Sequence, residues 1–206
     1  KKVWRGAKIM NIAVFAGHGG SDPGAVDPIE LEENDGIYQD DIYSEESDIN
    51  LAAALILQPM LEQNGHEVLM ARTEDVYVNL YDRVDMANEY DVDLVISLHA
   101  NAASNSTAAG IETLYYSSTR FTSRKGKRLA ALVQKRLIAV TDTPDRGIKG
   151  KEKIWVLRKT DMPAILVEMG FITNLREEKL LNEREYLYLL MEAVAEGVED
   201  YLKESS

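Results

Sequence analysis

Cysteine is absent from the 206-residue sequence, which excludes disulfide bonds and thiolate metal ligands. A metal site would therefore have to use imidazoles and carboxylates, and the chain has only three histidines. The sequence also lacks a Pro/Gly/Ser-rich linker, a repeat of fixed period, and any apolar run near the roughly 20 residues that span a bilayer. We therefore expect no transmembrane segment.

Positive charge is scarce, because 23 Lys and Arg face 35 Asp and Glu and give a net charge of −12. Affinity for nucleic acid rests largely on clustered cations, so nucleic acid is excluded as an expected partner. General attraction to an anionic cell wall or membrane is disfavoured for the same reason. Docking at such a surface would need a specific groove or another module.

The chain opens at Lys1 and lacks the basic, apolar and small-residue succession of a secretory signal. We expect a processed or excised piece in which a signal or targeting segment is absent. The length and the 45% hydrophobic content predict one α/β domain over residues 1–206, with a core of about residues 8–203.

Strands and helices alternate along the predicted elements. Apolar runs predict strands, and apolar stripes of helical period predict helices. Their alternation predicts a mainly parallel sheet with helices on both faces. Pro59 is expected to kink or shorten its helix, for which Ser47 or Asp48 is the predicted N-cap. The predicted strands are 8–15, 68–71, 93–98, 111–116, 154–157 and 164–167, and the helices are 48–63, 80–90, 125–139, 175–181 and 187–202.

Residues that can bind a metal stand at the ends of these elements. His18, His99 and Glu168 each follow a predicted buried strand, and Glu46 lies just before a predicted helix. Ligands of such sheets bind beyond the carboxyl ends of the strands. We therefore expect these side chains to converge in a hydrolytic zinc site.

The chemistry of such a site follows from its ligand types. Two imidazoles and one carboxylate leave the fourth position of zinc open, as in catalytic sites. Zinc can lower the pKa of bound water to about 7 and polarise a carbonyl oxygen. An unligated carboxylate such as Glu168 can then serve as the base and later the acid, which typically contributes about 10²–10⁴-fold.

Each residue also has a simpler interpretation when taken alone. Residues 17–20, Gly-His-Gly-Gly, could form a tight turn or a phosphate-binding loop, although the P-loop ending and the dinucleotide spacing are missing. Glu46 could belong to a solvated acidic stretch, and Glu168 could be an ion-paired structural residue. His66 follows Asn64-Gly65 at a predicted turn and is placed outside the site.

Four segments taken in order are specific as a set: GHGGSDPGA at 17–25, Glu46 four residues before Asn50, SLHAN at 97–101, and MPAILVE at 162–168. Supporting segments are RTED at 72–75, DRGI at 145–148 and GFITN at 170–174. Over nearly its entire length, the chain closely resembles the zinc-dependent N-acetylmuramoyl-L-alanine amidases of the amidase-3 type.

The resemblance implies a peptidoglycan hydrolase that cleaves the amide between N-acetylmuramic acid and L-alanine of the stem peptide. It implies zinc held by His18, Glu46 and His99, with Glu168 as the catalytic glutamate. It also implies a mixed sheet of about six strands flanked by helices. The expected location is the bacterial cell wall or periplasm, outside the membrane. We expect a monomer, with any wall-binding module beyond these termini.

Two other functions remain open at this stage. One is a peptidoglycan-binding or regulatory pseudoenzyme, although the retained Glu168 argues against it. The other is a zinc peptidase acting within the stem peptide, which the same metal chemistry permits.

Two features depart from the family pattern. The family usually has an aspartate three residues before the first histidine, where this chain has Phe15. A contact that orients a ligand is therefore expected to be missing or supplied by a different residue. The segment 27–45 is longer and more acidic than usual; we hypothesise that it borders the substrate groove as a lid or specificity element, against a plain mobile loop or a calcium site.

Overall fold

The computed structural model describes residues 9–26 and 43–204, and within them six strands form one sheet. The strand order is β2-β1-β3-β6-β4-β5. The strands are β1 (Asn11–Ala16), β2 (Glu67–Met70), β3 (Leu94–Asn101), β4 (Ile111–Tyr116), β5 (Asp145–Lys151) and β6 (Ala164–Phe171). The four strands β2, β1, β3 and β6 are parallel, whereas β4 runs antiparallel to β6 and β5 runs parallel to β4.

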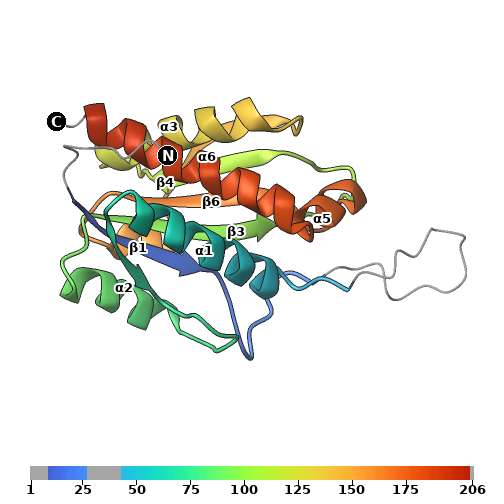
Figure 1. Ribbon diagram of the computed structural model, residues 1–206, viewed down its shortest axis with the longest axis horizontal. Helices are drawn as coiled ribbons and strands as arrows, with labels where there is room; N and C mark the ends of the chain where they lie inside the picture. The colour runs from blue at the N-terminus through green and yellow to red at the C-terminus, as the bar shows by residue number, and fades with distance from the viewer. Residues whose placement is uncertain (1–8, 27–42, 205–206) are drawn as a thin grey trace, which may run out of the picture.

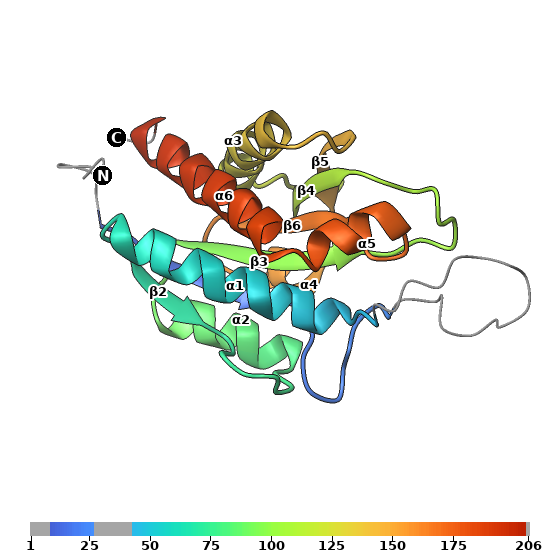
Figure 2. The same ribbon diagram turned by 45° about the vertical axis from the view of Figure 1, so that its right-hand side comes forward.

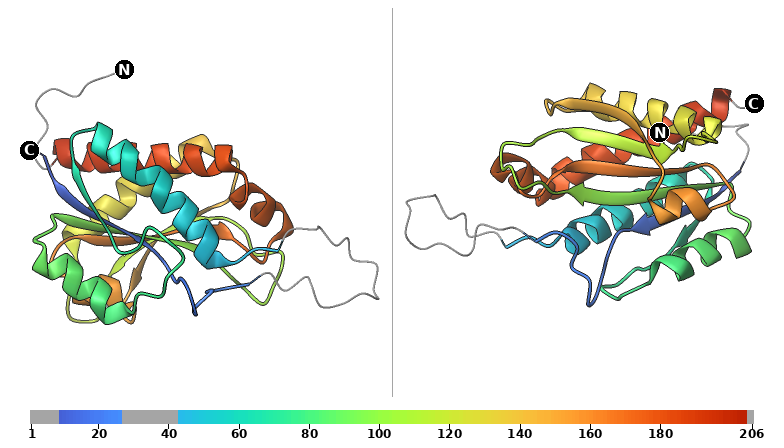
Figure 3. Two further views of the ribbon diagram at one scale, coloured as in Figure 1. Left: turned by 60° about the horizontal axis from the view of Figure 1, so that its bottom comes forward. Right: turned by 180° about the vertical axis from the view of Figure 1, so that it is seen from behind.

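Helices cover both faces of the sheet (Figures 1 and 3). One face carries α1 (Glu46–Gln63), α3 (Arg124–Val140) and α6 (Arg184–Glu204), and the other carries α2 (Leu80–Glu89) and α4 (Trp155–Lys159). The short α5 (Leu175–Leu181) follows β6 and leads into α6, as the turned view in Figure 2 shows. The predicted fold class, a mainly parallel mixed sheet of about six strands flanked by helices, is confirmed.

The core has two parts because the central strands are buried on both faces. Alternate residues of β1 face opposite sides, so Ile12 and Val14 join the large cluster under α1, α3 and α6. Ala13 and Phe15 join the smaller cluster under α2 and α4. Such strands appear as continuous apolar runs in the sequence.

One predicted strand was wrong, and one strand at the sheet edge was missed. Residues 154–157 form the start of α4 rather than a strand, because Val156 and Leu157 bury their side chains in the smaller cluster from a helical turn. The strand β5 was not predicted, because its sequence DRGIKGK is charged and glycine-rich. It is an edge strand with exposed ends, where charged residues are common.

Other boundaries differ in ways that matter for the site. Helix α1 begins at Glu46 itself, its N-cap is Glu45 without a side-chain hydrogen bond, and it continues through Pro59 to Gln63. Strands β3 and β6 extend past the predicted ends, so His99 and Glu168 lie inside strands rather than after them. Most of the acidic segment 27–45 lies outside the described residues.

None of the helices in the described ranges is long and apolar enough to cross a membrane.

Gly197 allows α6 to lie against α3. A Cβ atom at this position would be 2.7 Å from the Cα atom of Val133, which is backbone and cannot move aside alone. We expect Gly197→Ala to lower the free energy of unfolding by about 1–3 kcal/mol, as overpacking does. Denaturant unfolding would measure this. Glu192→Ala, an exposed change on the same helix, should stay within about 0.5 kcal/mol and serves as the control.

Candidate metal centre

The turn that follows β1 is shaped to present His18. The His18 backbone has a φ of 58°, an uncommon left-handed conformation for a residue with a side chain. A Cβ atom at Gly17 would lie 2.3 Å from Cε1 of His99, so only glycine lets the second imidazole approach the turn. The Nδ1 atom of His18 lies 2.9 Å from a carboxylate oxygen of Asp22, which fixes the ring from the side opposite Nε2.

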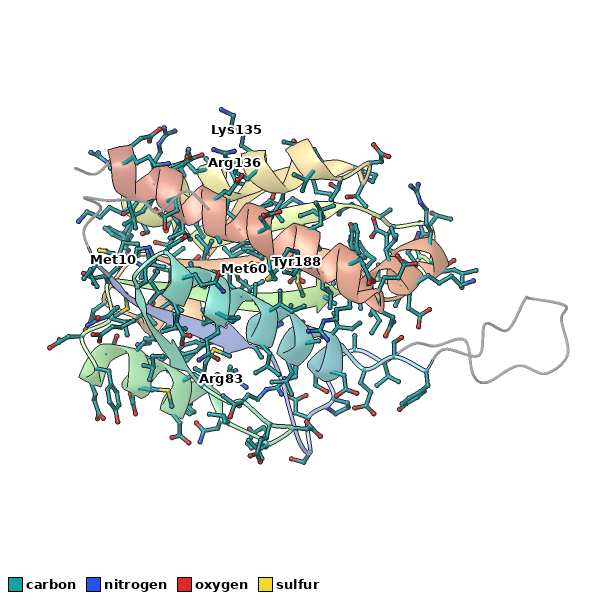
Figure 4. All side chains as sticks on the ribbon, viewed as in Figure 1. Met10, Met60, Arg83, Lys135, Arg136 and Tyr188 are labelled. Atoms are coloured by element: carbon teal, nitrogen blue, oxygen red, sulfur yellow. The ribbon has the colours of Figure 1, made fainter. Side chains whose placement is uncertain are left out.

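Two buried arginines hold the backbone of this turn. Arg83 donates from Nη2 to the carbonyl oxygen of His18 at 2.7 Å and also donates to the carbonyl oxygen of Ala16. Arg72 donates to the carbonyl oxygens of Gly17, at 2.9 Å, and Ser47, at 2.7 Å. In Figure 4 Arg83 lies below β1. Both arginines therefore act on the structure of the site.

Glu46 joins the two histidines. Its Oε1 atom lies 2.9 Å from Nδ1 of His99, and its Oε2 atom lies 3.3 Å from Nε2 of His18. The amide of Asn50, one turn along α1, donates to the same carboxylate at 3.3 Å. One ligand atom from each of His18, Glu46 and His99 lies within 4.8 Å of the others, so these three residues could hold a metal ion.

The charges of this group are strongly coupled. The hydrogen bond to Glu46 is the main reason that the pKa of His18 is raised to about 9. Burial alone would raise the pKa of Glu46, but hydrogen bonds from His18 and His99 outweigh it and lower that pKa well below its usual range. Glu46 is therefore an ionised carboxylate that attracts positive charge, whether protons or a metal cation.

Glu168 lies opposite His99 on the neighbouring strand, in register with it. Burial, and then the charges of Glu46 and Glu112, raise the pKa of Glu168 to about 8. Its Oε2 atom is buried without a hydrogen-bond partner. A buried polar atom without a partner is costly, and such atoms in native structures often serve a function.

Glu112 provides a contrast, because it pairs with Glu168 across β4 and β6. Burial raises its pKa, but hydrogen bonds with Lys149 and Arg146 outweigh this and lower it overall. The Nε atom of Arg146 lies 2.9 Å from the Glu112 carboxylate. The pKa values of these two adjacent carboxyl groups are thus shifted in opposite directions, because hydrogen bonds with two cations dominate at Glu112 and burial dominates at Glu168.

A cavity of about 370 Å³ opens beside the two histidines. Its wall is largely apolar on the side of α4, and Trp155 is held there by an edge contact with Tyr81 at 5.1 Å between ring centroids. Ser97 of β3 also lines the cavity. The lining includes His18, Asp22, Arg83, Ser97, His99, Lys153, Trp155 and Leu166.

The structure thus brings together all four predicted residues and places the third histidine elsewhere. His66 lies 2.8 Å from Glu199 through Nε2 and accepts a hydrogen bond from the Met10 backbone through Nδ1, so it is buried in a contact with α6. Phe15 is fully buried in the smaller core cluster. A carboxylate still contacts His18, but it belongs to Asp22, four residues after the histidine, rather than to a residue at position 15. The role of Asp22 was not predicted from the sequence.

Comparisons with known proteins agree with this geometry. The sequence profile of the amidase-3 family, described as N-acetylmuramoyl-L-alanine amidase, matches residues 12–200. The chain belongs to the amidase-3 family. The solved N-acetylmuramoyl-L-alanine amidase from Clostridium difficile 630 shares 33% identity and a TM-score of 0.84, covering 96% of this chain and 99% of that one.

Sequence relatives in the amidase-3 family differ in length. The chain is 32% identical to the uncharacterized protein YqiI of Bacillus subtilis and covers 84% of it. It is 31% identical to the N-acetylmuramoyl-L-alanine amidase LytC of Bacillus subtilis, over 93% of this chain but only 35% of LytC. It covers 60% of the probable cell wall amidase LytH of Staphylococcus saprophyticus at 29% identity.

Proposed function

We propose that this chain is a zinc-dependent peptidoglycan amidase that cleaves the amide between N-acetylmuramic acid and L-alanine of the stem peptide. The observation that carries the proposal is the convergence of His18, Glu46 and His99 next to the buried, unpartnered carboxyl group of Glu168. Membership of the amidase-3 family supports the reaction type. We further propose that residues 1–206 are one catalytic domain acting in or near the bacterial cell wall.

The donor set fits zinc. Ligand atoms about 2.0 Å from a tetrahedral zinc lie about 3.3 Å from each other. Glu46 reaches His99 through Oε1 at 2.9 Å and His18 through Oε2 at 3.3 Å, and one ligand atom from each of the three residues lies within 4.8 Å of the others. Two nitrogens and one carboxylate oxygen are also the ligand types of catalytic zinc sites with a position left for water.

When bound, zinc supplies a Lewis acid that activates water and polarises the scissile carbonyl. Glu168 takes the proton of the attacking water and delivers a proton to the departing amine of L-alanine. Its Oε2 atom is buried and has no hydrogen-bond partner, and a cation nearby favours the ionised form that burial disfavours. Asp22 holds His18 in the tautomer that leaves Nε2 free to bind the metal.

The cavity beside the histidines supports a peptide-bearing substrate. Its apolar wall at Trp155 suits the small methyl groups next to the scissile amide, and Lys153 at its rim suits a carboxylate of the stem peptide. The chain spans about a third of the length of LytC. We propose that any module that binds the cell wall lies outside residues 1–206.

Digestion of purified muropeptides tests the proposal. We expect release of an intact stem peptide with a free L-alanine amine, detected by mass spectrometry. Shortened peptides still attached to muramic acid would identify a peptidase instead. A zinc-loaded protein that binds muropeptides and releases nothing would identify a binding protein.

Asp22 provides a direct test of the contact that supports His18. We expect Asp22→Ala to lower zinc affinity by about 10–100-fold, as loss of a residue that orients a metal ligand does. Competition with a chromophoric chelator would measure this. Asp22→Asn, which can still accept the Nδ1 proton, should restore most of the affinity.

Asp75→Ala is the matched control, because Asp75 accepts a hydrogen bond from Gly20 in the same turn without contacting His18. Equal losses in Asp22→Ala and Asp75→Ala would mean that turn shape, rather than the contact, sets the affinity.

A further inference from the structure

A second cavity, of about 810 Å³, lies at the end of the sheet opposite the metal centre. It is bordered by the end of β4, the start of α3, the end of α4 and the residues before β6. We call it the cationic pocket, because its lining contains Arg120, Arg124, Lys125 and Arg158 against one acidic residue, Asp161. This is unexpected in a chain with a net charge of −12.

The four cations of the pocket make no ion pair with any described residue, and their side chains donate no hydrogen bond to the described residues. Two other arginines of α3 are paired: Arg128 binds Glu204, and Arg136 binds Glu196 at 2.9 Å. The chain therefore has acidic partners available but places none of them beside these four residues, except for Asp161.

Helix stability does not explain this arrangement. The first turn of α3 contains Arg124 and Lys125 and no acidic residue. Cations at a helix N-terminus oppose the helix dipole, so they cost stability there. Residues that are retained against local stability are candidates for binding.

A pair of aromatic rings, one of them exposed, lies in the same lining. The rings of Tyr116 and Phe121 are 6.0 Å apart between centroids and tilted by 32°. Phe121 is 60% exposed, a large fraction for a phenylalanine whose ring is already held by a neighbour. An exposed ring offers an apolar face to the C–H groups of a sugar. A cluster of cations without such a ring has no apolar face for a sugar.

We propose that the cationic pocket binds an anionic glycopolymer linked by phosphodiesters. The planar guanidinium groups of Arg120, Arg124 and Arg158 match phosphate oxygens in pairs. The ring of Phe121 stacks on the sugar units that the polymer carries. Because the net charge of the protein repels polyanions at long range, binding must come from this local cluster.

The position of the pocket leaves the metal centre open. Pro163 lines the pocket just before β6, and Glu168 lies five residues further on. At about 3.3 Å per residue, the two sites are roughly 16 Å apart along the strand. A bound polymer would therefore hold the protein at a surface without covering Glu168.

The experiment is calorimetric titration of the full, zinc-loaded chain with glycosylated poly(glycerol phosphate) over a range of salt concentrations. The test variant is Arg120→Gln/Arg124→Gln/Arg158→Gln. The control is Lys135→Gln/Arg176→Gln/Arg184→Gln, which removes the same number of charges from exposed positions outside the pocket. Figure 4 shows Lys135 projecting away from α3.

We expect the test variant to bind at least about tenfold more weakly at low salt, with the slope of log affinity against log salt reduced by about 2, as for loss of three phosphate contacts. The control should bind within about twofold of the wild type. Phe121→Ala should remove the preference for glycosylated over unglycosylated polymer.

The proposal is overturned if the wild type does not bind the polymer, or if the control loses as much affinity as the test variant. Equal affinity for poly-glutamate would show a general preference for negative charge. Tighter binding of an oligonucleotide or of phosphatidylglycerol vesicles through the same residues would assign the pocket to a different partner. None of these measurements depends on hydrolysis, so they remain informative if the proposed amidase activity fails.

Discussion

Replacing Glu168 with glutamine is expected to lower turnover on peptidoglycan by about 10²–10⁴-fold while zinc remains bound, since a glutamine cannot accept the proton of the attacking water. The two side chains have nearly the same size, and Oε2 of Glu168 has no hydrogen-bond partner to lose. The fold and the three metal-binding residues should therefore be unaffected. Release of soluble fragments measures turnover, and atomic emission measures zinc in the same samples.

Glu112→Gln is the control for this experiment. Glu112 lies opposite Glu168 but is already paired with Arg146 and Lys149. Its replacement changes the local charge without removing the proposed base, so turnover should stay within about tenfold of the wild type. Equal losses in the two variants would mean that local charge, rather than proton transfer by Glu168, limits the reaction.

Removing the metal is expected to have the second large effect. Glu46→Gln replaces the only carboxylate of the proposed ligand set with a neutral amide, so zinc occupancy and turnover should both fall to background. Dialysis of the wild type against a chelator should do the same, and zinc should restore only the wild type. Free zinc at 1,000 times its dissociation constant stabilises the folded state by about 4.1 kcal/mol, so the melting temperature gives an independent measure of zinc binding.

Glu45→Gln tests whether position matters within the acidic pair. The carboxylate of Glu45 accepts a hydrogen bond from Tyr43 at 3.1 Å and is not part of the cluster that could hold a metal. The Glu45→Gln variant should therefore bind zinc and show the same zinc-dependent rise in melting temperature as the wild type. If Glu46→Gln kept both properties as well, the proposed ligand set would be wrong.

The central part of the fold was predictable because its strands are buried on both faces. Runs such as residues 94–98 and 164–167 have no polar face, so their length and composition identify them. The predicted strand over 111–116 matches β4 residue for residue. Because three of these strands are parallel neighbours, their sequence ends indicated where His18, His99 and Glu168 meet.

The edges and the supporting contacts were not predictable for physical reasons. A short apolar run such as residues 154–157 fits a strand or a helical turn equally well until its packing is known. The bond between His18 and Asp22 depends on a left-handed backbone at His18, which the sequence does not specify. The carbonyl groups that Arg72 and Arg83 bind come from segments distant in the chain.

The order of strands has a consequence for when this protein can act. The residues of the proposed site span positions 18 to 168 and come from the turn after β1, from α1, β3 and β6. They meet only when β1 has paired with β3, and β3 with β6. Contacts between such distant segments form only when much of the chain is in place. A partly synthesised or partly folded chain therefore has no complete site, which delays any hydrolytic activity until folding is finished.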